Sequence, residues 1–255
     1  MLRRAVAVAF IVGMLVVGSR GQESSPKSEV QRNREILAAR SKVGSLRPIL
    51  KVLDKANLSA SLEFSGHCES LDVRDFPEFP QFRAPVASGG PPLQTLREIF
   101  ADDPAMQVTQ DPDGTIRMIE SGVPTDILNV KIGHISFEGS GANQLHAATY
   151  SPNLALNRVF EAEELNLFLK AHDIEWPVFG SISIMSSKTP PLPAVPHLSG
   201  SLDNVTLSEA LDHILKTFPG IWIYETCSRS DTKKRLIYFH FFHLQKLGTS
   251  EEYVQ

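Results

Sequence analysis

Two stretches, REIFADDPAMQVTQ at Arg97–Gln110 and DHILKTFPGIWIYE at Asp212–Glu225, decide how the chain folds. Each holds the end of an amphipathic helix, then a proline, Pro104 or Pro219, and then a run patterned as a strand. Proline cannot continue a helix, and apolar residues at a period of two indicate a strand. Both stretches therefore predict a helix, a break at proline and a strand, and their likeness predicts an internal duplication.

The elements around the two stretches follow one order twice. Residues 45–121 and residues 158–244 each predict a helix, a strand, a proline-rich loop, an extended segment, a second helix and a hairpin. The second helix of the later copy opens on a T-x-x-E capping box, Thr206 and Glu209. The expected fold class is α+β: two tandem repeats, each with two helices packed on a small mixed or antiparallel sheet, joined by a linking strand.

The remaining segments complete the expected organisation. Arg3 and Arg4, an apolar run and small residues up to Gly21 are typical of a signal peptide, and the apolar run is too short to span a bilayer comfortably. No cysteine lies near Gly21, which disfavours a lipoprotein anchor. We expect a signal peptide at 1–21, a polar leader with a candidate helix at 22–44, the first repeat at 45–121, a linking strand and connector at 122–157, the second repeat at 158–244, and a tail at 245–255.

The net charge of the cleaved chain disfavours binding to nucleic acid. Cleavage at residue 21 removes three of the 25 basic residues and none of the 29 acidic ones, so the formal net charge changes from −4 to −7. An acidic chain is a poor candidate for binding nucleic acid. After cleavage we expect no integral membrane span and a periplasmic or secreted location.

The segment HLSGSLDNVTLSEALDHILKTFPGIWIYE, residues 197–225, resembles the short N-terminal domain of secretins and TonB-dependent receptors, the STN domain. The resemblance rests on the helix motif and on the strand that follows it: Thr206, Leu207, Glu209, Ala210, Leu211, Ile214, Leu215 and Ile221–Tyr224. It covers residues 160–243 and, more faintly, residues 45–120, where Pro91-Pro92 replaces the threonine cap. It implies a small periplasmic α/β module that docks onto proteins, without implying that the chain is itself a secretin or a receptor.

Cysteine usage leaves two alternatives. Cys68 and Cys227 are the two cysteines of the chain, and each lies in one predicted repeat. In an oxidising compartment such a pair permits one disulfide, which would link the repeats. Sequence spacing alone does not establish the close approach that a disulfide requires, so the alternative is that both residues are free or lie far apart.

Residues 109–120 imitate a calcium-binding EF loop. Asp111, Asp113 and Glu120 fall at its third, fifth and twelfth places. Thr109 replaces the leading acid, however, and both flanks are patterned as strands. A hairpin turn through Asp111-Pro-Asp-Gly114 is the favoured interpretation, and the calcium loop is the alternative.

We find no catalytic constellation in the sequence. It has no G-x-S-x-G, H-E-x-x-H, C-x-x-C or glycine-rich phosphate motif. His240 and His243 would point to opposite faces of one strand, so that strand alone cannot use both as metal ligands. We therefore expect no catalytic residues, no cofactor, no metal and no enzymatic activity, with an unrecognised enzyme as a remaining alternative.

Exposed apolar segments favour a protein partner. The strand RLIYFHFF, residues 235–242, is apolar on both faces, so one face needs a cover from the other repeat, a partner chain or an added strand. The loop TPPLPAVP could dock as a polyproline segment or act as a stiff connector. The candidate interaction residues are Phe76, Phe79, Phe82, Pro191, Pro193, Tyr238 and Phe241. We expect an interaction or assembly module of the cell envelope with an envelope protein partner, compatible with a homo-oligomer; the alternative is a periplasmic small-ligand or metal-binding protein.

Overall fold

The computed structural model describes residues 46–66, 90–138, 151–176, 196–228, 232–247 and 250–254, and for residues 243–247 and 250–254 it describes the backbone only. The class is mixed α+β, as the sequence predicts: these ranges hold five α-helices and a mixed sheet. Within them, no helix combines the length and the apolar character that crossing a membrane requires. The predicted signal peptide and leader lie outside the described ranges.

The elements up to the middle of the chain come in the predicted order. A helix at 46–56 leads to β1 (Ala60–Ser65), α2 (Pro92–Ile99), β2 (Met106–Gln110) and β3 (Ile116–Glu120). The linking segment holds a 3₁₀ turn, η1 (Asp126–Asn129), and β4 (Lys131–Ser136).

The later elements are α3 (Pro152–Phe160), α4 (Glu163–Ala171), β5 (Ile174–Glu175), β6 (Ser201–Thr206), α5 (Leu207–Thr217), β7 (Gly220–Ser228), β8 (Arg235–Leu247) and β9 (Ser250–Val254). The capping box of α5 is present: Thr206 N–H donates to Glu209 Oε2 at 2.7 Å, and Glu209 N–H donates to Thr206 Oγ1 at 3.2 Å. Two elements differ from expectation. Helix α3 begins within the predicted connector and ends within the predicted second repeat, and the predicted tail contains β9.

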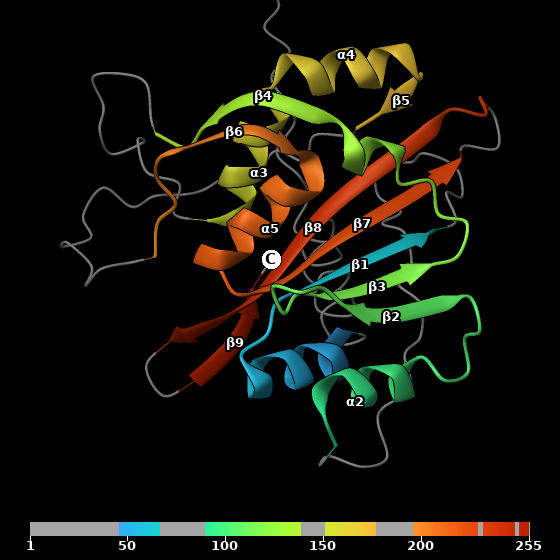
Figure 1. The fold of residues 1–255 in the computed structure, drawn as a ribbon, viewed down its shortest axis with the longest axis vertical. Helices are drawn as coiled ribbons and strands as arrows, with labels where there is room; N and C mark the ends of the chain where they lie inside the picture. Colours follow the sequence, from blue (N-terminus) through green and yellow to red (C-terminus); the bar gives the residue numbers. More distant parts are fainter. Residues whose placement is uncertain are drawn as a thin grey trace, which may run out of the picture.

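One seven-stranded sheet runs through both predicted repeats. Its order is β2-β3-β1-β7-β8-β5, with β9 paired to β8 (Figure 1). The strands β1 and β7 join the two regions in parallel, with Ala60 opposite Ile221 and Ser65 opposite Thr226. The expectation of a separate small sheet in each repeat is therefore wrong. Burial explains the joint, because all residues of β7 from Ile221 to Cys227 are buried and such a strand needs a neighbour on each side.

The linking strand β4 does not enter this sheet. It pairs antiparallel with β6 in a two-stranded ribbon, with Lys131 opposite Thr206 and Ser136 opposite Ser201. The ribbon leads directly into α5, because Thr206 is both the last residue of β6 and the N-cap of the helix.

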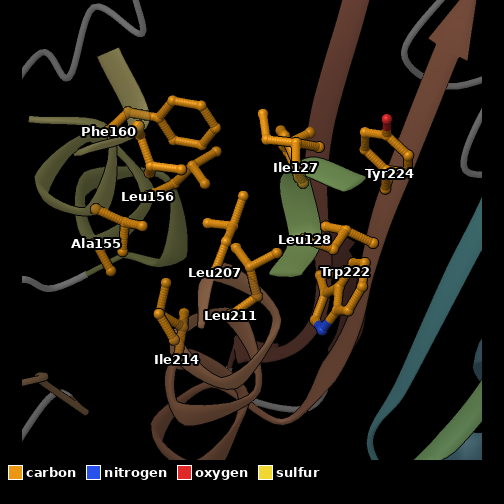
Figure 2. Close-up of a cluster of buried hydrophobic side chains, with 14 of the residues drawn as sticks. Ile127, Leu128, Ala155, Leu156, Phe160, Leu207, Leu211, Ile214, Trp222 and Tyr224 are labelled. Carbon is orange, nitrogen blue, oxygen red and sulfur yellow. The ribbon is translucent and has the colours of Figure 1, made fainter. Parts of the chain in front are cut away.

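Helices cover both faces of the large sheet. The helix at 46–56 and α2 pack on one face, whereas α3, α4 and α5 lie on the other (Figure 1). Alternation along β7 separates two cores: Ile221 and Ile223 belong to the α2-side core, and Trp222 and Tyr224 belong to the α5-side core. Figure 2 shows part of the α5-side core, where Leu207, Leu211 and Ile214 of α5 meet Ala155, Leu156, Phe160, Ile127, Leu128, Trp222 and Tyr224.

The strand β8 is an interior element. Phe241 is 1% exposed in the α5-side core, and Tyr238 is 5% exposed on the opposite face of the strand. Both were candidate interaction residues, and that assignment is wrong for these two. The apolar character of both faces reflects burial on both sides of the strand.

Candidate functional site: the Arg117 cluster

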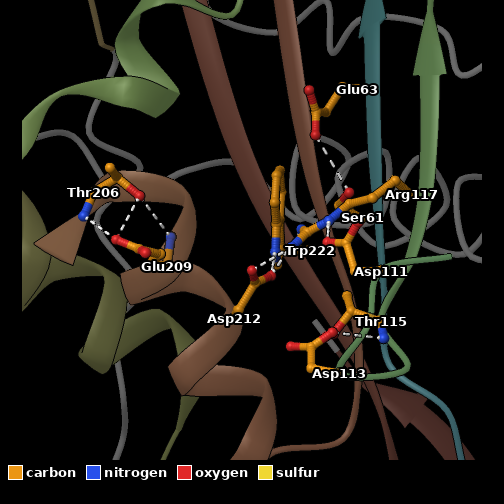
Figure 3. Close-up of polar contacts among 10 residues, drawn as sticks. All are labelled: Ser61, Glu63, Asp111, Asp113, Thr115, Arg117, Thr206, Glu209, Asp212 and Trp222. Carbon is orange, nitrogen blue, oxygen red and sulfur yellow. Dashed lines mark hydrogen bonds and ion pairs between the residues drawn. The ribbon is translucent and has the colours of Figure 1, made fainter. Parts of the chain in front are cut away.

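A group of polar side chains lies on the α5-facing side of the sheet, where β3, β1 and β7 are neighbours. We call it the Arg117 cluster, and Figure 3 shows its members together. It consists of Ser61, Glu63, Asp111, Arg117, Asp212 and Trp222. The strand pairing places Ser61 opposite both Arg117 and Trp222, so these three residues form one row across three strands. The cluster therefore spans elements of both predicted repeats.

Arg117 is the centre of the cluster. Its Nη1 donates to Asp212 Oδ1 at 2.9 Å, its Nη2 donates to Asp212 Oδ2, and its Nε donates to Asp111 Oδ2 at 2.7 Å. Two parallel N–H···O bonds between a guanidinium and a carboxylate are among the stronger charge-assisted contacts. Burial by itself lowers the pKa of Arg117, but the hydrogen bonds and charges of Asp212 and Asp111 outweigh it and raise the pKa above its usual value. Arg117 is therefore a permanent cation.

Asp212 connects the cation to an aromatic ring. Its Oδ1 also accepts from Trp222 Nε1 at 2.8 Å, and the Arg117 guanidinium lies 5.9 Å from the centre of the Trp222 ring. The side chains of Arg117 and Asp212 are both 13% exposed. Helix α5 supplies Asp212, β3 supplies Arg117 and β7 supplies Trp222. This arrangement holds α5 against the strands by directional contacts as well as by apolar packing.

Glu63 is the buried acid of the cluster. It is 4% exposed, and Ser61 Oγ donates to its Oε1 at 3.3 Å. Burial raises the pKa of Glu63 to about 7, while the charge of Arg117 opposes the shift and the charges of Asp212 and Asp111 add to it. A buried carboxyl holds its proton because water no longer stabilises the anion. Glu63 thus titrates close to neutral pH.

A second polar group adjoins the cluster on the same face. Tyr224, paired with Glu63 across β1 and β7, donates its hydroxyl to Pro124 O at 2.8 Å. Arg235 on β8 donates to Asp126 Oδ1 at 2.7 Å, to Pro124 O at 2.6 Å and to the Tyr224 hydroxyl. Burial raises the pKa of Tyr224 above its usual value. These contacts attach the segment around η1 to the sheet.

The geometry of the Arg117 cluster suits a structural role and proton binding. Arg117 donates hydrogen bonds to two carboxylates, and Ser61 and Glu63 are almost completely buried. The group that can change state near neutral pH is Glu63, which gains or loses one proton. The cluster can therefore couple proton uptake to the contact between α5 and the strands.

The acidic residues of the candidate calcium loop point to different partners. Asp111 pairs with Arg117, Asp113 Oδ1 accepts from Thr115 N–H at 3.0 Å, and Glu120 Oε2 accepts from Ser65 N–H at 2.6 Å. The segment is a hairpin, with Gly114 at a φ of 94° in the turn between β2 and β3. Across the described ranges, no three His, Cys, Asp or Glu side chains gather as a metal site would require. The structure agrees with the hairpin interpretation.

The other predicted site residues are divided between described and undescribed parts. Cys227 is buried at the end of β7 and belongs to a disulfide. Cys68 lies outside the described residues, so the pairing of Cys68 with Cys227 stays a prediction. The loop residues Phe76, Phe79, Phe82, Pro191 and Pro193 also lie outside them. His240 is buried and stacks beside Tyr238 at 6.5 Å, on the opposite side of the sheet from the Arg117 cluster.

Sequence reasoning missed Glu63, Arg117 and Asp212. A signal existed for the first two, because each is an ionisable residue inside an apolar strand pattern, ASLEFS for Glu63 and IRMIE for Arg117. An inward-facing charge in a strand calls for a buried partner. Asp212 had no such signal, because an acid on an amphipathic helix is normally solvated.

Comparison with models of protein families, with curated proteins and with solved structures found no significant match to this chain.

Proposed function

We propose that the chain is a non-enzymatic interaction or assembly module of the cell envelope, of STN-like type. The observation that supports it best is the β6–α5–β7 unit. There an extended segment enters a helix through the Thr206–Glu209 capping box, and an aromatic strand follows. This is the order of elements in the sequence motif that resembles the STN domain.

A periplasmic or secreted location is part of the proposal. Cys227 belongs to a disulfide, and such bonds persist in oxidising compartments. The signal-like residues 1–21 support the same location.

We also propose that the two halves arose by duplication. The supporting observation is the strand order. In the first half β3 has an antiparallel neighbour, β2, and a parallel one, β1. In the second half β8 likewise has an antiparallel neighbour, β7, and a parallel one, β5. The helices of the halves cover opposite faces of the sheet, so a half-turn about an axis across the strands relates the two arrangements.

Two strand edges carry contacts that hinder the addition of another strand. Arg97 Nε of α2 donates to Val108 O of β2 at 3.1 Å, and Glu164 Oε1 of α4 accepts from Gly133 N–H of β4 at 2.8 Å. Side chains that cap free edge groups are a recognised protection against strand pairing. We therefore place partner binding on a helix face in preference to these edges.

The helix face that we favour is the outer side of α4. Leu167 is 58% exposed there, the most exposed large hydrophobic side chain in the described ranges, and Leu154 of α3 is 37% exposed. Isolated exposed leucines occur on many proteins, so the surface needs a direct test.

Site-specific photocrosslinking in the native envelope supplies that test. A photoreactive residue at Leu167 is expected to give discrete adducts with an outer-membrane or secretion-system component. The matched control is Lys51, which is exposed on the helix at 46–56 on the other side of the sheet. Equal adducts at both positions, or none at either, would contradict partner binding on the α4 face.

A further inference from the structure

We propose that Glu63 is the proton-sensing residue of a latch in which Arg117 holds helix α5 to the strands of the N-terminal half through Asp212. The latch is a property of the described fold and does not depend on the identity of any partner. Its moving part is the contact between β3 and α5, whose two residues lie 95 positions apart in the chain. Its trigger is a carboxyl on β1, the strand between β3 and β7.

Several elements near Glu63 contribute a polar or charged group. Ser61 of β1 donates to it, Arg117 of β3 attracts its anion, and Asp111 of the hairpin and Asp212 of α5 repel it. On its other flank is Tyr224 of β7, whose hydroxyl is held by Pro124 O and by Arg235 of β8. Asp126 of η1 forms an ion pair with Arg235. The charged groups near Glu63 thus already have partners of opposite charge when Glu63 is neutral.

Deprotonation of Glu63 upsets this balance. With neutral Glu63 the Arg117 cluster holds one cation and two anions, and each of the three guanidinium nitrogens donates one hydrogen bond to a carboxylate. Ionised Glu63 adds a third anion that is 4% exposed. A buried unpaired carboxylate is strongly unfavourable, so either Arg117 turns towards Glu63 or water enters. Both responses weaken the contact between Arg117 and Asp212.

The direction of the pH effect follows from the pKa of Glu63, which burial raises from 4.5 to about 7. In this range the folded protein binds a proton that the unfolded chain releases. The contribution of neutral Glu63 to stability is therefore complete below about pH 4.5, decreases as the pH rises, and is lost above about pH 7. The latch is closed in mildly acidic solution and loosened in mildly alkaline solution.

Hydrogen exchange of the whole mature chain between pH 5.5 and pH 8.5 tests the latch. After correction for intrinsic exchange rates, amides of α5 are expected to lose protection by up to about thirtyfold as Glu63 ionises, because about 1.5 pH units separate pH 5.5 from its pKa of about 7. The isosteric variant Glu63→Gln should keep the protection at both pH values. Glu120→Gln is the matched control, because Glu120 lies on the opposite face of β3 and should leave the wild-type pH dependence unchanged. The same pH dependence in Glu63→Gln as in the wild type would overturn the proposal, and so would a flat profile in the wild type.

A measurement on the wild-type side chain covers the case in which Glu63→Gln does not fold. Carbon NMR of labelled glutamate should show one carboxyl that titrates near neutral pH. In a Trp176→Phe background, in which Trp222 is the remaining indole of the chain, the Trp222 Nε1–H resonance should shift with the same midpoint, because Asp212 accepts from it. The latch would be contradicted if no glutamate carboxyl titrated near neutral pH, or if the Trp222 Nε1–H resonance did not shift over the same pH range.

Discussion

Arg117 of β3 and Asp212 of α5 form a two-point ion pair across 95 residues of chain, and Trp222 donates to the same carboxylate. The pair joins the hairpin of the first half to the principal helix of the second. It lies beside the buried Glu63, so its strength depends on groups from at least three elements.

Removing one partner of this pair should be more damaging than removing both. Asp212→Ala leaves Arg117 buried with one counter-ion and Trp222 Nε1 without its acceptor, so we expect the free energy of unfolding to fall by about 3–5 kcal/mol. The double variant Arg117→Met, Asp212→Leu should lose less, because no buried charge of the pair remains and Asp111, which also loses its partner, is 38% exposed and can be solvated. Urea unfolding measures both. A double variant at least as unstable as Asp212→Ala would contradict this account.

The capping box of α5 should contribute a modest, local stabilisation. Thr206→Ala removes the acceptor of Glu209 N–H, and loss of such a cap costs about 1 kcal/mol. Ser151→Ala at α3, where Ser151 Oγ accepts from Leu154 N–H at 3.3 Å, should have a similar effect. Thermal unfolding would reveal both losses, and Ser201→Ala, at an exposed position on the ribbon, provides a control of the same size. A cap variant as stable as that control would show that the cap is not formed in solution.

Glu209 also gives the capping box a pH dependence opposite to that of Glu63. Hydrogen bonds from Thr206 lower the pKa of Glu209, so the ionised side chain is favoured in the folded state. Its contribution to stability is present above the unfolded-state pKa of about 4.5 and is lost as the pH falls. In a plot of the free energy of unfolding against pH, we expect Glu209→Gln to remove part of the loss of stability at acidic pH. Glu63→Gln should remove part of the loss around neutral pH. A variant that changed both regions of the plot would contradict the assignment.

Phe241 should behave as a core residue. Phe241→Ala removes a side chain that is 1% exposed, and comparable truncations cost about 3–5 kcal/mol. Leu167→Ala, at a 58% exposed position, should change stability by less than about 0.5 kcal/mol. Denaturant midpoints of the two variants provide the comparison. If Phe241→Ala changed stability as little as Leu167→Ala, Phe241 would not be a core residue.

The disulfide of Cys227 should close onto Cys68. Gly66 N–H donates to Thr226 O at 2.8 Å, so the chain leaves β1 beside Cys227, and Cys68 follows two residues later. Such a bond closes a loop of about 160 residues, and the chain-entropy relation assigns it about 5 kcal/mol. Mass spectrometry after alkylation should find no free thiol before reduction. Two alkylated cysteines in the unreduced protein would contradict the pairing.

Local signals explain what the sequence predicted well. The capping box, the break at Pro219 and the Asp111–Gly114 turn each act within a few residues, and α5 and both hairpins lie where they were expected. Ser151-Pro152 was also a local signal, an N-cap serine followed by proline in the first turn, but the polar connector around it hid α3.

Other features depend on partners that are distant in the chain. The pairing of β1 with β7 and the contact of Arg117 with Asp212 arise when the halves pack, and neither has a signature within a short window. The same applies to Tyr238 and Phe241, because a strand that is apolar on both faces fits an interior position as well as an exposed one. The assignments of Phe76, Phe79, Phe82, Pro191 and Pro193 stay predictions.

The parallel joint between β1 and β7 also sets the order of events during biosynthesis. Ala60 pairs with Ile221, about 160 residues later, so one edge of β1 stays open until most of the chain has been made. Contacts of such long range slow folding and leave an apolar strand available for wrong pairings in the meantime. If the chain is exported, as we propose, it would have to stay unfolded until both halves have crossed the membrane, and a chaperone that shields β1 would have its greatest effect in that interval.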